Sequence, residues 1–284
     1  MQPLLQLSAE RPLIAPLVFD PISALLAARE GFDALYLGGG ALGYIKAITE
    51  ANLSLTEMAQ AAIDIKAVCD KPLILDGVCG WGDAVHMRRT VRLAQAAGFA
   101  GIEIEDQVLP KRVHHHVGLD EVTTCERMVA KVEAAVAART DSNFTIIART
   151  NAARAVSLKE ALHRGREYRR AGADIVLVIH NKPEEVRIIA EELGGPLMFI
   201  SYPGGVMGMP LSAVEMHALG YRIIVDPTTP LIAAYDALRN CYRRIAREPA
   251  NVIKGGFPVI GEVEADIHAL IGLRSMLEIE DRTT

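Results

Sequence analysis

The sequence is poor in cysteine and in aromatic residues. Its 284 residues include four cysteines and one tryptophan, and aromatic residues make up 5% of the chain. The cysteines are far apart and form no CxxC pair, and no basic segment precedes the apolar residues near the N-terminus, as a secretory signal would require. A reducing, cytoplasmic location is therefore predicted.

The chain also lacks an excess of basic residues and any long apolar run. Its 30 Lys and Arg residues against 35 Asp and Glu residues give a formal net charge of -5, so no basic field is present to attract nucleic acid. No apolar run reaches the roughly 20 residues that span a bilayer. Neither nucleic acid nor a membrane is an expected partner.

What the sequence does contain is a regular alternation of two patterns. Short runs rich in Val and Ile alternate about eight times with longer segments of helical period. Such repetition predicts a parallel sheet closed into a (β/α)₈ barrel. The predicted strands are Leu13–Phe19, Ala34–Leu37, Leu73–Asp76, Gly101–Glu105, Phe144–Arg149, Ile175–Ile179, Leu197–Ser201 and Ile223–Asp226.

Polar residues stand at the carboxyl ends of these predicted strands, the edge at which barrel enzymes build their active sites. Some of them would instead cap the following helix, an alternative that stays open above all for Asp20 and Asp226. The polar residues are Asp20, Asp76, Glu103, Glu105, Asp106, Arg149, Asn151, His180, Ser201 and Asp226.

The C-terminal part departs from the alternation. After an eighth predicted helix, Leu231–Glu248, a segment with Pro and Gly leads to an amphipathic helix predicted over Val263–Ile279. We expect a barrel domain at residues 1–248 and a linker with a helix at residues 249–284. Since a closed barrel has no internal place for this helix, its apolar face is expected against a neighbouring subunit or beneath its own barrel.

Two acids lie close together on the fourth predicted strand. Glu103 and Glu105 are two residues apart and so point to the same side of the strand. Together with Asp76 they would attract a hard cation such as Mg²⁺, which takes few protein carboxylates and keeps several waters. Glu103 has a second interpretation, as a protonated or Lys-paired group of the core.

Four longer motifs resemble one known family over essentially the whole chain. They are FDPISALLAAREGFDALYLGGGALG, LILDGVCGWGDAVHMRRTVRLAQAAGFAGIEIEDQVLPKR, FTIIARTNA and EYRRAGADIVLV. They resemble the isocitrate lyase/phosphoenolpyruvate mutase superfamily. The resemblance implies a (β/α)₈ barrel, a helix-swapped dimer or tetramer, and Mg²⁺-assisted chemistry on a small 2-oxo or 2-hydroxy carboxylate through an enolate-type oxyanion.

The resemblance also implies roles for single residues. Asp76 and Glu105 match acids of the family's metal site, and Gly38–Gly40 match the loop whose backbone amides cradle the carboxylate of the substrate. Arg149 matches the arginine that grips a substrate anion. Asp20, at a predicted strand end, joins these residues as a candidate for substrate binding.

Two acids of the family are missing where they are expected. Members usually read DADxGYG where this chain reads DGVCGWG, so Val78 replaces one metal-linked acid. The aspartate after the glycine loop is also missing, and its place falls near Thr49 or Glu50. These losses weaken divalent-metal binding, and the adjacent Cys79 is a poor ligand for Mg²⁺ that is expected to pack instead.

The loop LPKRVHHHVG departs from the family as well. Lyases of the family read KRCGH here, with a cysteine that acts as general acid/base, and the alignment places Val113 at that cysteine. Since valine transfers no proton, His114 or His115 is the candidate for the task. Adjacent side chains diverge, which argues against a metal site made of all three histidines. We expect a gating loop that brings Lys111 and one histidine to the substrate, with a solvated loop as the alternative.

Three further positions distinguish subgroups of the family. His180 stands where mutase and phosphonopyruvate hydrolase members have histidine and alkylmalate-type lyases have glutamate, although it also fits a strand-end hydrogen-bonding residue. Ser201 stands where those lyases tend to have asparagine. Asn151 replaces the commoner aspartate, as in the oxaloacetate decarboxylase members.

The leading prediction is a lyase that cleaves a C–C bond of a small 2-oxo or 2-hydroxy carboxylate. Decarboxylation is favoured over retro-aldol cleavage, because departing CO₂ needs no cysteine-like acid. One alternative is P–C bond chemistry on a phosphonopyruvate-like substrate, which His180 suggests. The other is a barrel that has lost catalysis and binds a carboxylate or a protein, which Val78 and Val113 suggest.

Overall fold

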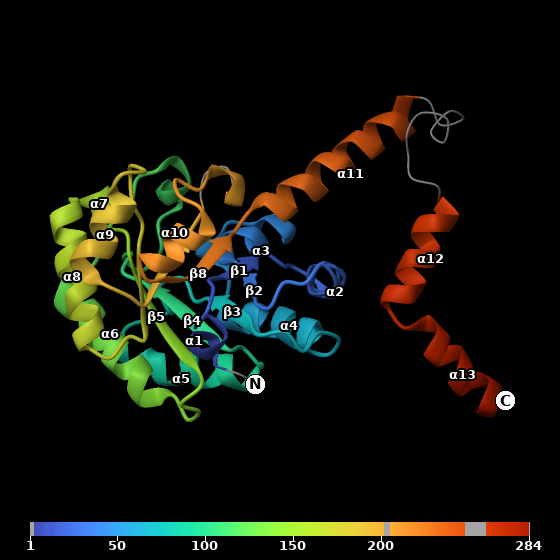
Figure 1. Cartoon of the computed structure of the whole chain (residues 1–284), viewed down its shortest axis with the longest axis horizontal. Coiled ribbons are helices and arrows are strands. Elements are labelled where there is room, and N and C mark those ends of the chain that lie inside the picture. The colour runs from blue at the N-terminus through green and yellow to red at the C-terminus, as the bar shows by residue number, and fades with distance from the viewer. Residues whose placement is uncertain (1–2, 202–204, 248–259, 284) are drawn as a thin grey trace. The chain divides into compact units, whose positions relative to one another are not determined.

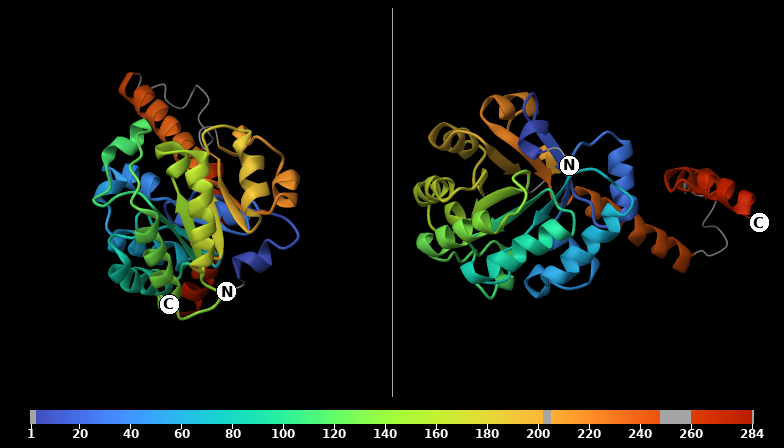
Figure 2. Two further views of the ribbon diagram at one scale, coloured as in Figure 1. Left: turned by 90° about the vertical axis from the view of Figure 1, so that its left-hand side faces the viewer. Right: turned by 90° about the horizontal axis from the view of Figure 1, so that it is seen from below.

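The main part of the chain is a barrel of eight parallel strands surrounded by helices (Figures 1 and 2). The computed structural model describes residues 3–201, 205–247 and 260–283. The strands pair in the order β1-β8-β7-β6-β5-β4-β3-β2. A bridge from Leu17 to Tyr36 and a 2.9 Å hydrogen bond from Val18 N to Tyr36 O join the first strand to the second. The predicted (β/α)₈ barrel is confirmed.

The strands lie where the apolar runs predicted them. The third and fourth have the predicted bounds, and the first ends earlier than expected, where the chain turns to bridge the second strand. The strands are β1 Leu13–Pro16, β2 Leu35–Leu37, β3 Leu73–Asp76, β4 Gly101–Glu105, β5 Thr145–Thr150, β6 Ile175–Val178, β7 Leu197–Ile200 and β8 Tyr221–Asp226.

Helices follow the strands, and side chains cap several of their N-termini. Asp20, Ser54 and Asp83 each accept a hydrogen bond from a backbone N–H of the helix that follows, as capping residues do. The α-helices of the barrel unit are α1 Leu4–Leu7, α2 Pro21–Arg29, α3 Gly39–Ile45, α4 Leu55–Lys66, α5 Ala84–Ala96, α6 Cys125–Ala138, α7 Ala152–Ala155, α8 Leu158–Arg170, α9 Glu185–Leu193 and α10 Ala213–Ala218. Three short 3₁₀ helices are η1 Glu50–Asn52, η2 Val113–Val117 and η3 Gly205–Gly208.

The strands separate two apolar layers because successive side chains point to opposite faces. On β4, Ile102 and Ile104 belong to the outer layer between the sheet and the helices. Inside the barrel, a cluster that includes Ile74, Ile147 and Leu177 fills the lower part, and Leu4 of α1 packs into it. Residues of even number on β3 and of odd number on β4 and β5 therefore face the interior. This alternation decides which strand-end side chains can meet.

The chain divides into two compact units, residues 1–230 and Leu231–Thr284. Helix α11 spans Thr229–Arg247, close to its predicted bounds. Residues 248 and 249, where the domain boundary was predicted, lie outside the described part of the chain. The prediction of a single final helix was wrong. The structure has two helices there, α12 Ile260–Leu270 and α13 Leu273–Thr283. They are separated at Gly272, because its φ of 72° interrupts a helix.

Among the helices in the described ranges, none is both long and apolar enough to cross a membrane.

Candidate active site

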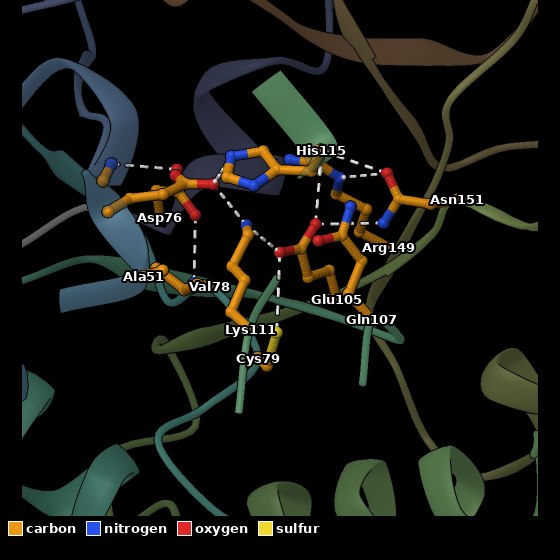
Figure 3. Close-up of polar contacts among 12 residues, drawn as sticks. Ala51, Asp76, Val78, Cys79, Glu105, Gln107, Lys111, His115, Arg149 and Asn151 are labelled. Carbon is orange, nitrogen blue, oxygen red and sulfur yellow. Dashed lines mark hydrogen bonds and ion pairs between the residues drawn. The ribbon is translucent and has the colours of Figure 1, made fainter. Parts of the chain in front are cut away.

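The three strand-end residues that were predicted to form the site all face the barrel interior. Asp76 ends β3, Glu105 ends β4, and Arg149 lies near the end of β5. The strand register places Arg149 beside Glu105, and the Nη2 atom of Arg149 lies 3.2 Å from Oε2 of Glu105 (Figure 3). The position of Asp76, Glu105 and Arg149 at predicted strand ends therefore located a cluster of charged side chains in the structure.

Glu103 lies one layer deeper, below Arg149. Its carboxylate accepts a 2.8 Å hydrogen bond from Nη1 of Arg149 and a 3.0 Å bond from the hydroxyl of Tyr36. Burial raises the pKa of Glu103 to about 7, although the positive charge of Arg149 opposes this change. Glu103 is therefore a core group and not a part of the charged cluster at the barrel mouth. Its cationic partner is an arginine and not a lysine.

Lys111 enters the site from the loop after β4. Its Nζ atom forms close ion pairs with Oε1 of Glu105 and Oε1 of Glu50, and its side chain is only 5% exposed (Figure 3). Burial works against a charged ammonium, but the carboxylates of Glu105 and Glu50 outweigh it and raise the pKa of Lys111. The loop thus places a permanent positive charge over the strand ends.

Glu50 supplies an acid that the sequence comparison treated as lost. It begins η1, directly after Thr49, and its Oε1 atom lies 2.6 Å from Nε2 of His115. Burial disfavours the carboxylate, but the hydrogen bond from His115 and the charge of Lys111 lower the pKa of Glu50 below its ordinary value. The prediction of two missing acids is corrected to one, because the fold brings the side chain of Glu50 into the cluster.

The three loop histidines have different hydrogen-bond partners, although the rings of His115 and His116 do not diverge and lie with their centroids 3.9 Å apart. Within η2, His115 is half-buried, and its bond to Glu50 outweighs burial and raises the pKa of its imidazole. His116 contacts Thr49 Oγ1 at 2.8 Å and Tyr44 OH at 3.2 Å. His114 is exposed. Of the two proposed proton carriers, only His115 reaches the acidic cluster, and His116 ties the loop to α3 and to the segment that follows it.

The glycine loop lies against Asp76. The backbone N–H of Gly39 donates to Oδ2 of Asp76 at 2.9 Å, and the N–H of Val78 donates to Oδ1 at 3.0 Å. A Cβ atom on Gly39 would lie 3.0 Å from Val78 Cγ2, 3.3 Å from Glu50 Oε2 and 3.4 Å from Asp76 Oδ2, so only glycine leaves this space free. Val78 adopts a φ of 48°, a strained conformation for a β-branched residue and one that is typical of functional sites.

Asn151 joins Glu105 to Arg149 on the side opposite Lys111. Its Nδ2 atom donates to Glu105 Oε2 at 3.0 Å, and its Oδ1 atom accepts from Arg149 Nη2 at 3.1 Å. An amide can do both, whereas an aspartate could only accept. The replacement of the commoner aspartate by Asn151 therefore fits the contacts that this residue makes.

Cys79 is buried under the cluster. Its thiol donates to Glu105 Oε1 at 3.7 Å, and burial together with the charge of Glu105 raises the pKa of this thiol. Cys79 therefore stays a neutral packing group, as expected, and cannot replace the thiol that is missing at Val113.

Three other candidates make contacts outside the cluster. His180 stacks on Phe199 of the outer apolar layer, with ring centroids 5.3 Å apart, and burial lowers the pKa of its imidazole. The hydroxyl of Ser201 donates to Val225 O at 2.9 Å. Asp20 is exposed and caps α2 through a 2.7 Å bond from Ser23 N. The sequence does not indicate these separate contacts, because no residue pattern gives the direction of a side chain beyond the end of a strand.

The acids of the cluster suit a hard divalent cation. Asp76, Glu50 and Glu105 offer carboxylate oxygens, and the ammonium of Lys111 already occupies the place of a cation between two of them. With Lys111 in this position, no group of three or more His, Cys, Asp or Glu residues in the described part of the chain is arranged to hold a metal ion. The carboxylate donors thus suit Mg²⁺, but the ammonium of Lys111 lies between Glu50 and Glu105.

A barrel with buried acids, an arginine and a loop lysine at the carboxyl ends of its strands has the composition of an active site for an anionic substrate. Comparison with known proteins specifies the family. The sequence profile described as phosphoenolpyruvate phosphomutase matches residues 4–246, and the chain belongs to this family.

Characterised relatives in sequence carry the names of carboxylate-cleaving enzymes. The chain is 34% identical to 2,3-dimethylmalate lyase of Eubacterium barkeri over 96% of this chain and 94% of that protein. It is 37% identical to 2-methylisocitrate lyase of Aeropyrum pernix over 82% and 75% of the two chains. It is 36% identical to oxaloacetate decarboxylase of Pseudomonas putida over 80% and 77%.

Solved structures agree in fold. Phosphoenolpyruvate phosphomutase from Streptomyces platensis superimposes with a TM-score of 0.87 at 26% identity, with 98% of each chain covered. A phosphonopyruvate hydrolase in complex with oxalate and Mg²⁺ superimposes with a TM-score of 0.85 at 29% identity, over 98% of this chain and 96% of the other.

Proposed function

We propose that the protein is a lyase that breaks a C–C bond in a small 2-oxo or 2-hydroxy carboxylate. One observation carries the proposal: the buried acids Glu105 and Glu50 share the ammonium of Lys111, and Glu105 also pairs with Arg149, at the carboxyl ends of the strands. Buried charges are costly to a fold, and they concentrate where a charged substrate is bound and altered. The lyase and decarboxylase relatives favour the same chemistry.

The positive side chains of the cluster would bind the substrate. Arg149 presents a planar guanidinium at the barrel mouth, which suits a carboxylate in a two-pronged contact. Lys111 is held by carboxylates now, and it would turn to the substrate anion when one enters. The backbone N–H of Gly39 lies beside Asp76, and with the adjacent Gly38 and Gly40 it would approach the second carboxylate of the substrate, since glycine has no side chain to intervene.

The bond cleavage needs a place for negative charge. As the C–C bond of a 2-oxo acid breaks, its electron pair moves into the fragment that keeps the oxo group, which becomes an enolate. Lys111 and Arg149 lie where they would stabilise the enolate oxygen. His115, which lies half-buried beside the acids of the cluster, would then donate a proton to carbon.

We propose that Asp76, Glu105 and Glu50 hold Mg²⁺ in the working enzyme. When bound, the ion acts as a Lewis acid on the oxo group and the carboxylate of the substrate. Asp76 is already oriented for such a role by two backbone N–H groups.

Decarboxylation fits the cluster better than retro-aldol cleavage. A retro-aldol reaction needs a base for the hydroxyl of the substrate and a separate acid for the carbanion, whereas loss of CO₂ needs only the acid. The cluster holds one histidine and a thiol that stays protonated, and Val113 replaces the acid/base cysteine. We therefore place an oxaloacetate-like 2-oxo diacid first among substrates.

The test is a substrate panel. Oxaloacetate, 2-methylisocitrate, 2,3-dimethylmalate and phosphonopyruvate are offered with and without Mg²⁺, and pyruvate, CO₂ and phosphate are measured. Pyruvate and CO₂ from oxaloacetate above the spontaneous rate, lost in Arg149→Ala and Glu105→Gln, support the proposal. Phosphate from phosphonopyruvate alone would favour P–C chemistry, and turnover of no compound would favour a binding protein.

We further propose a cytoplasmic homo-oligomer, a dimer or tetramer in which the C-terminal unit pairs with a second copy. Apolar residues repeat every three or four positions along α11, at Ile232, Tyr235, Leu238, Tyr242 and Ile245. Such a stripe has the width that helices bury against another apolar surface. Sedimentation of the wild type against the double variant Leu238→Glu and Tyr242→Glu, which should sediment as a monomer, tests this assembly.

A further inference from the structure

We propose that the ammonium of Lys111 is a built-in competitor of the divalent cation, so that cation binding and the docked position of the loop exclude each other in the substrate-free protein. This inference rests on the proposed metal site and concerns its regulation. It follows from one juxtaposition: Lys111 Nζ pairs at the same time with a carboxylate oxygen of Glu50 and with one of Glu105. The pair with Glu105 is visible in Figure 3.

The carboxylates have little capacity left while Lys111 is docked. Glu105 uses one oxygen for Lys111 and Cys79 and the other for Asn151 and Arg149. Oε1 of Glu50 serves both Lys111 and His115. Oε2 of Glu50 lies beside Gly39 and Gly40, but both oxygens of Glu105 are in use. A divalent cation held between the two acids therefore displaces the ammonium, since two cations at one pair of carboxylates would repel each other without screening by water.

Displacement of Lys111 has a consequence for the loop. The loop is held to α3 and to the segment after it. Lys111 and His115 bind Glu50, and His116 contacts Thr49 and Tyr44. Two of these attachments end on Glu50. A cation on Glu50 therefore weakens both, and the loop becomes accessible. When an anionic substrate arrives, it offers the freed ammonium a new partner, which couples the binding of cation and substrate.

Calorimetry of Mg²⁺ binding tests the competition without any reaction. Lys111→Met removes the ammonium and keeps an unbranched chain, and we expect Mg²⁺ to bind about tenfold tighter or more than to the wild type. Lys111→Arg keeps the charge and should bind as weakly as the wild type. Thermal unfolding of each variant confirms that it is folded.

The matched control is Lys131→Met. Lys131 is also buried and acts on Glu105 through its charge, but its Nζ atom donates to the backbone oxygen of Cys79 and contacts neither carboxylate. If loss of any nearby positive charge tightened binding, Lys131→Met would gain as much as Lys111→Met, and the competition would be refuted. The expected gain is confined to Lys111→Met.

Tryptic cleavage after Arg112 gives a second measurement, because cleavage requires the loop to leave its docked position. Mg²⁺ should speed cleavage of the wild type several-fold over an NaCl solution of equal ionic strength, and Lys111→Met should be cleaved fast in both. Equal Mg²⁺ affinity in wild type and Lys111→Met, or cleavage that Mg²⁺ leaves unchanged, overturns the inference while the lyase proposal stands. Tighter binding in Lys111→Met without turnover of any substrate supports the inference and counts against the lyase.

Discussion

Glu105 and Asp106 are neighbours in the chain, yet they belong to two different networks. Glu105 faces the barrel interior and pairs with Lys111 of the loop and Arg149 of β5. Asp106 faces outward, where it accepts hydrogen bonds from Thr150 Oγ1 at 2.7 Å, Tyr168 OH at 2.8 Å and Arg164 Nη1 at 3.0 Å. Both carboxylates are buried, and the strand alternation alone sends them to opposite sides.

The difference between the two networks lies in where their partners come from. The partners of Asp106 belong to β5 and α8, which are fixed by the packing of the barrel. One partner of Glu105 comes from a loop, and the others would be shared with a substrate. A buried charge with fixed partners holds a fold together, whereas a buried charge whose partners can leave is available for binding and catalysis.

The largest expected effect is on catalysis at Glu105. Glu105→Gln keeps the shape but removes the charge that holds Lys111 and Arg149, so we expect oxaloacetate decarboxylation to fall by about 10³-fold. The free energy of unfolding should change far less than in a variant of Asp106. Pyruvate release measures the rate, and urea unfolding of the same preparation measures the stability. A large loss of stability with little loss of rate would assign Glu105 to the fold instead of to catalysis.

Asp106→Ala should produce the opposite result. It removes the buried carboxylate that Arg164 and Tyr168 share and leaves Arg164 with the more exposed Glu160, and breaking such a buried pair costs about 3–5 kcal/mol of unfolding free energy. Urea unfolding measures the loss, and Asp106→Asn, which keeps one acceptor oxygen, should lose less. An unfolding free energy equal to that of the wild type would remove the structural role assigned to this network.

A pH effect on stability is expected at Glu103, inside the barrel. Burial raises the pKa of its carboxyl from an ordinary value of 4.5 to about 7. Between these two values the unfolded chain releases a proton that the folded chain keeps, so stability falls as pH rises through this window. In Glu103→Gln this decline should largely disappear. Urea unfolding at pH 5 and pH 8 tests it, and identical pH dependence in both proteins would contradict the prediction.

His180 should show a smaller effect of the opposite sign. Burial lowers the pKa of its imidazole below the ordinary 6.5, so the unfolded chain takes up a proton that the folded chain refuses, and stability is lost as pH falls below that value. His180→Phe, which keeps an aromatic ring on Phe199, should lose less on going from pH 7 to pH 5. Its decarboxylation rate should stay near that of the wild type, and a rate reduced a hundredfold would return His180 to the active site.

The smallest effect is expected at Asp20, an acid at the same barrel edge that serves the fold. Asp20→Ala removes the cap of α2 and should cost about 1 kcal/mol of stability with little change in the KM for oxaloacetate. Thermal unfolding and steady-state kinetics measure the two quantities. A KM raised tenfold at unchanged stability would assign Asp20 to the substrate instead.

Much of the fold and part of the site could be predicted from the sequence. Apolar runs of strand length between helical segments define a (β/α)₈ barrel, because both faces of every strand are buried. The two-residue repeat of a strand then places Glu103 and Glu105 on the same side of the sheet. Asp76, Glu105 and Arg149 lie together because they stand at the carboxyl ends of β3, β4 and β5. These are local consequences of backbone geometry, and the structure agrees with each of them.

The amino-acid pattern was therefore enough to locate the barrel and the three charged residues at its strand ends. Tertiary contacts were needed to bring Glu50 to these charges, to pair it with Lys111 and His115, and to direct His180 and Ser201 to partners outside the cluster. The physical reason is that strands have a fixed period of two, whereas loops and strand ends have none. Their side chains go where distant parts of the chain offer a partner of opposite charge or a surface to pack on.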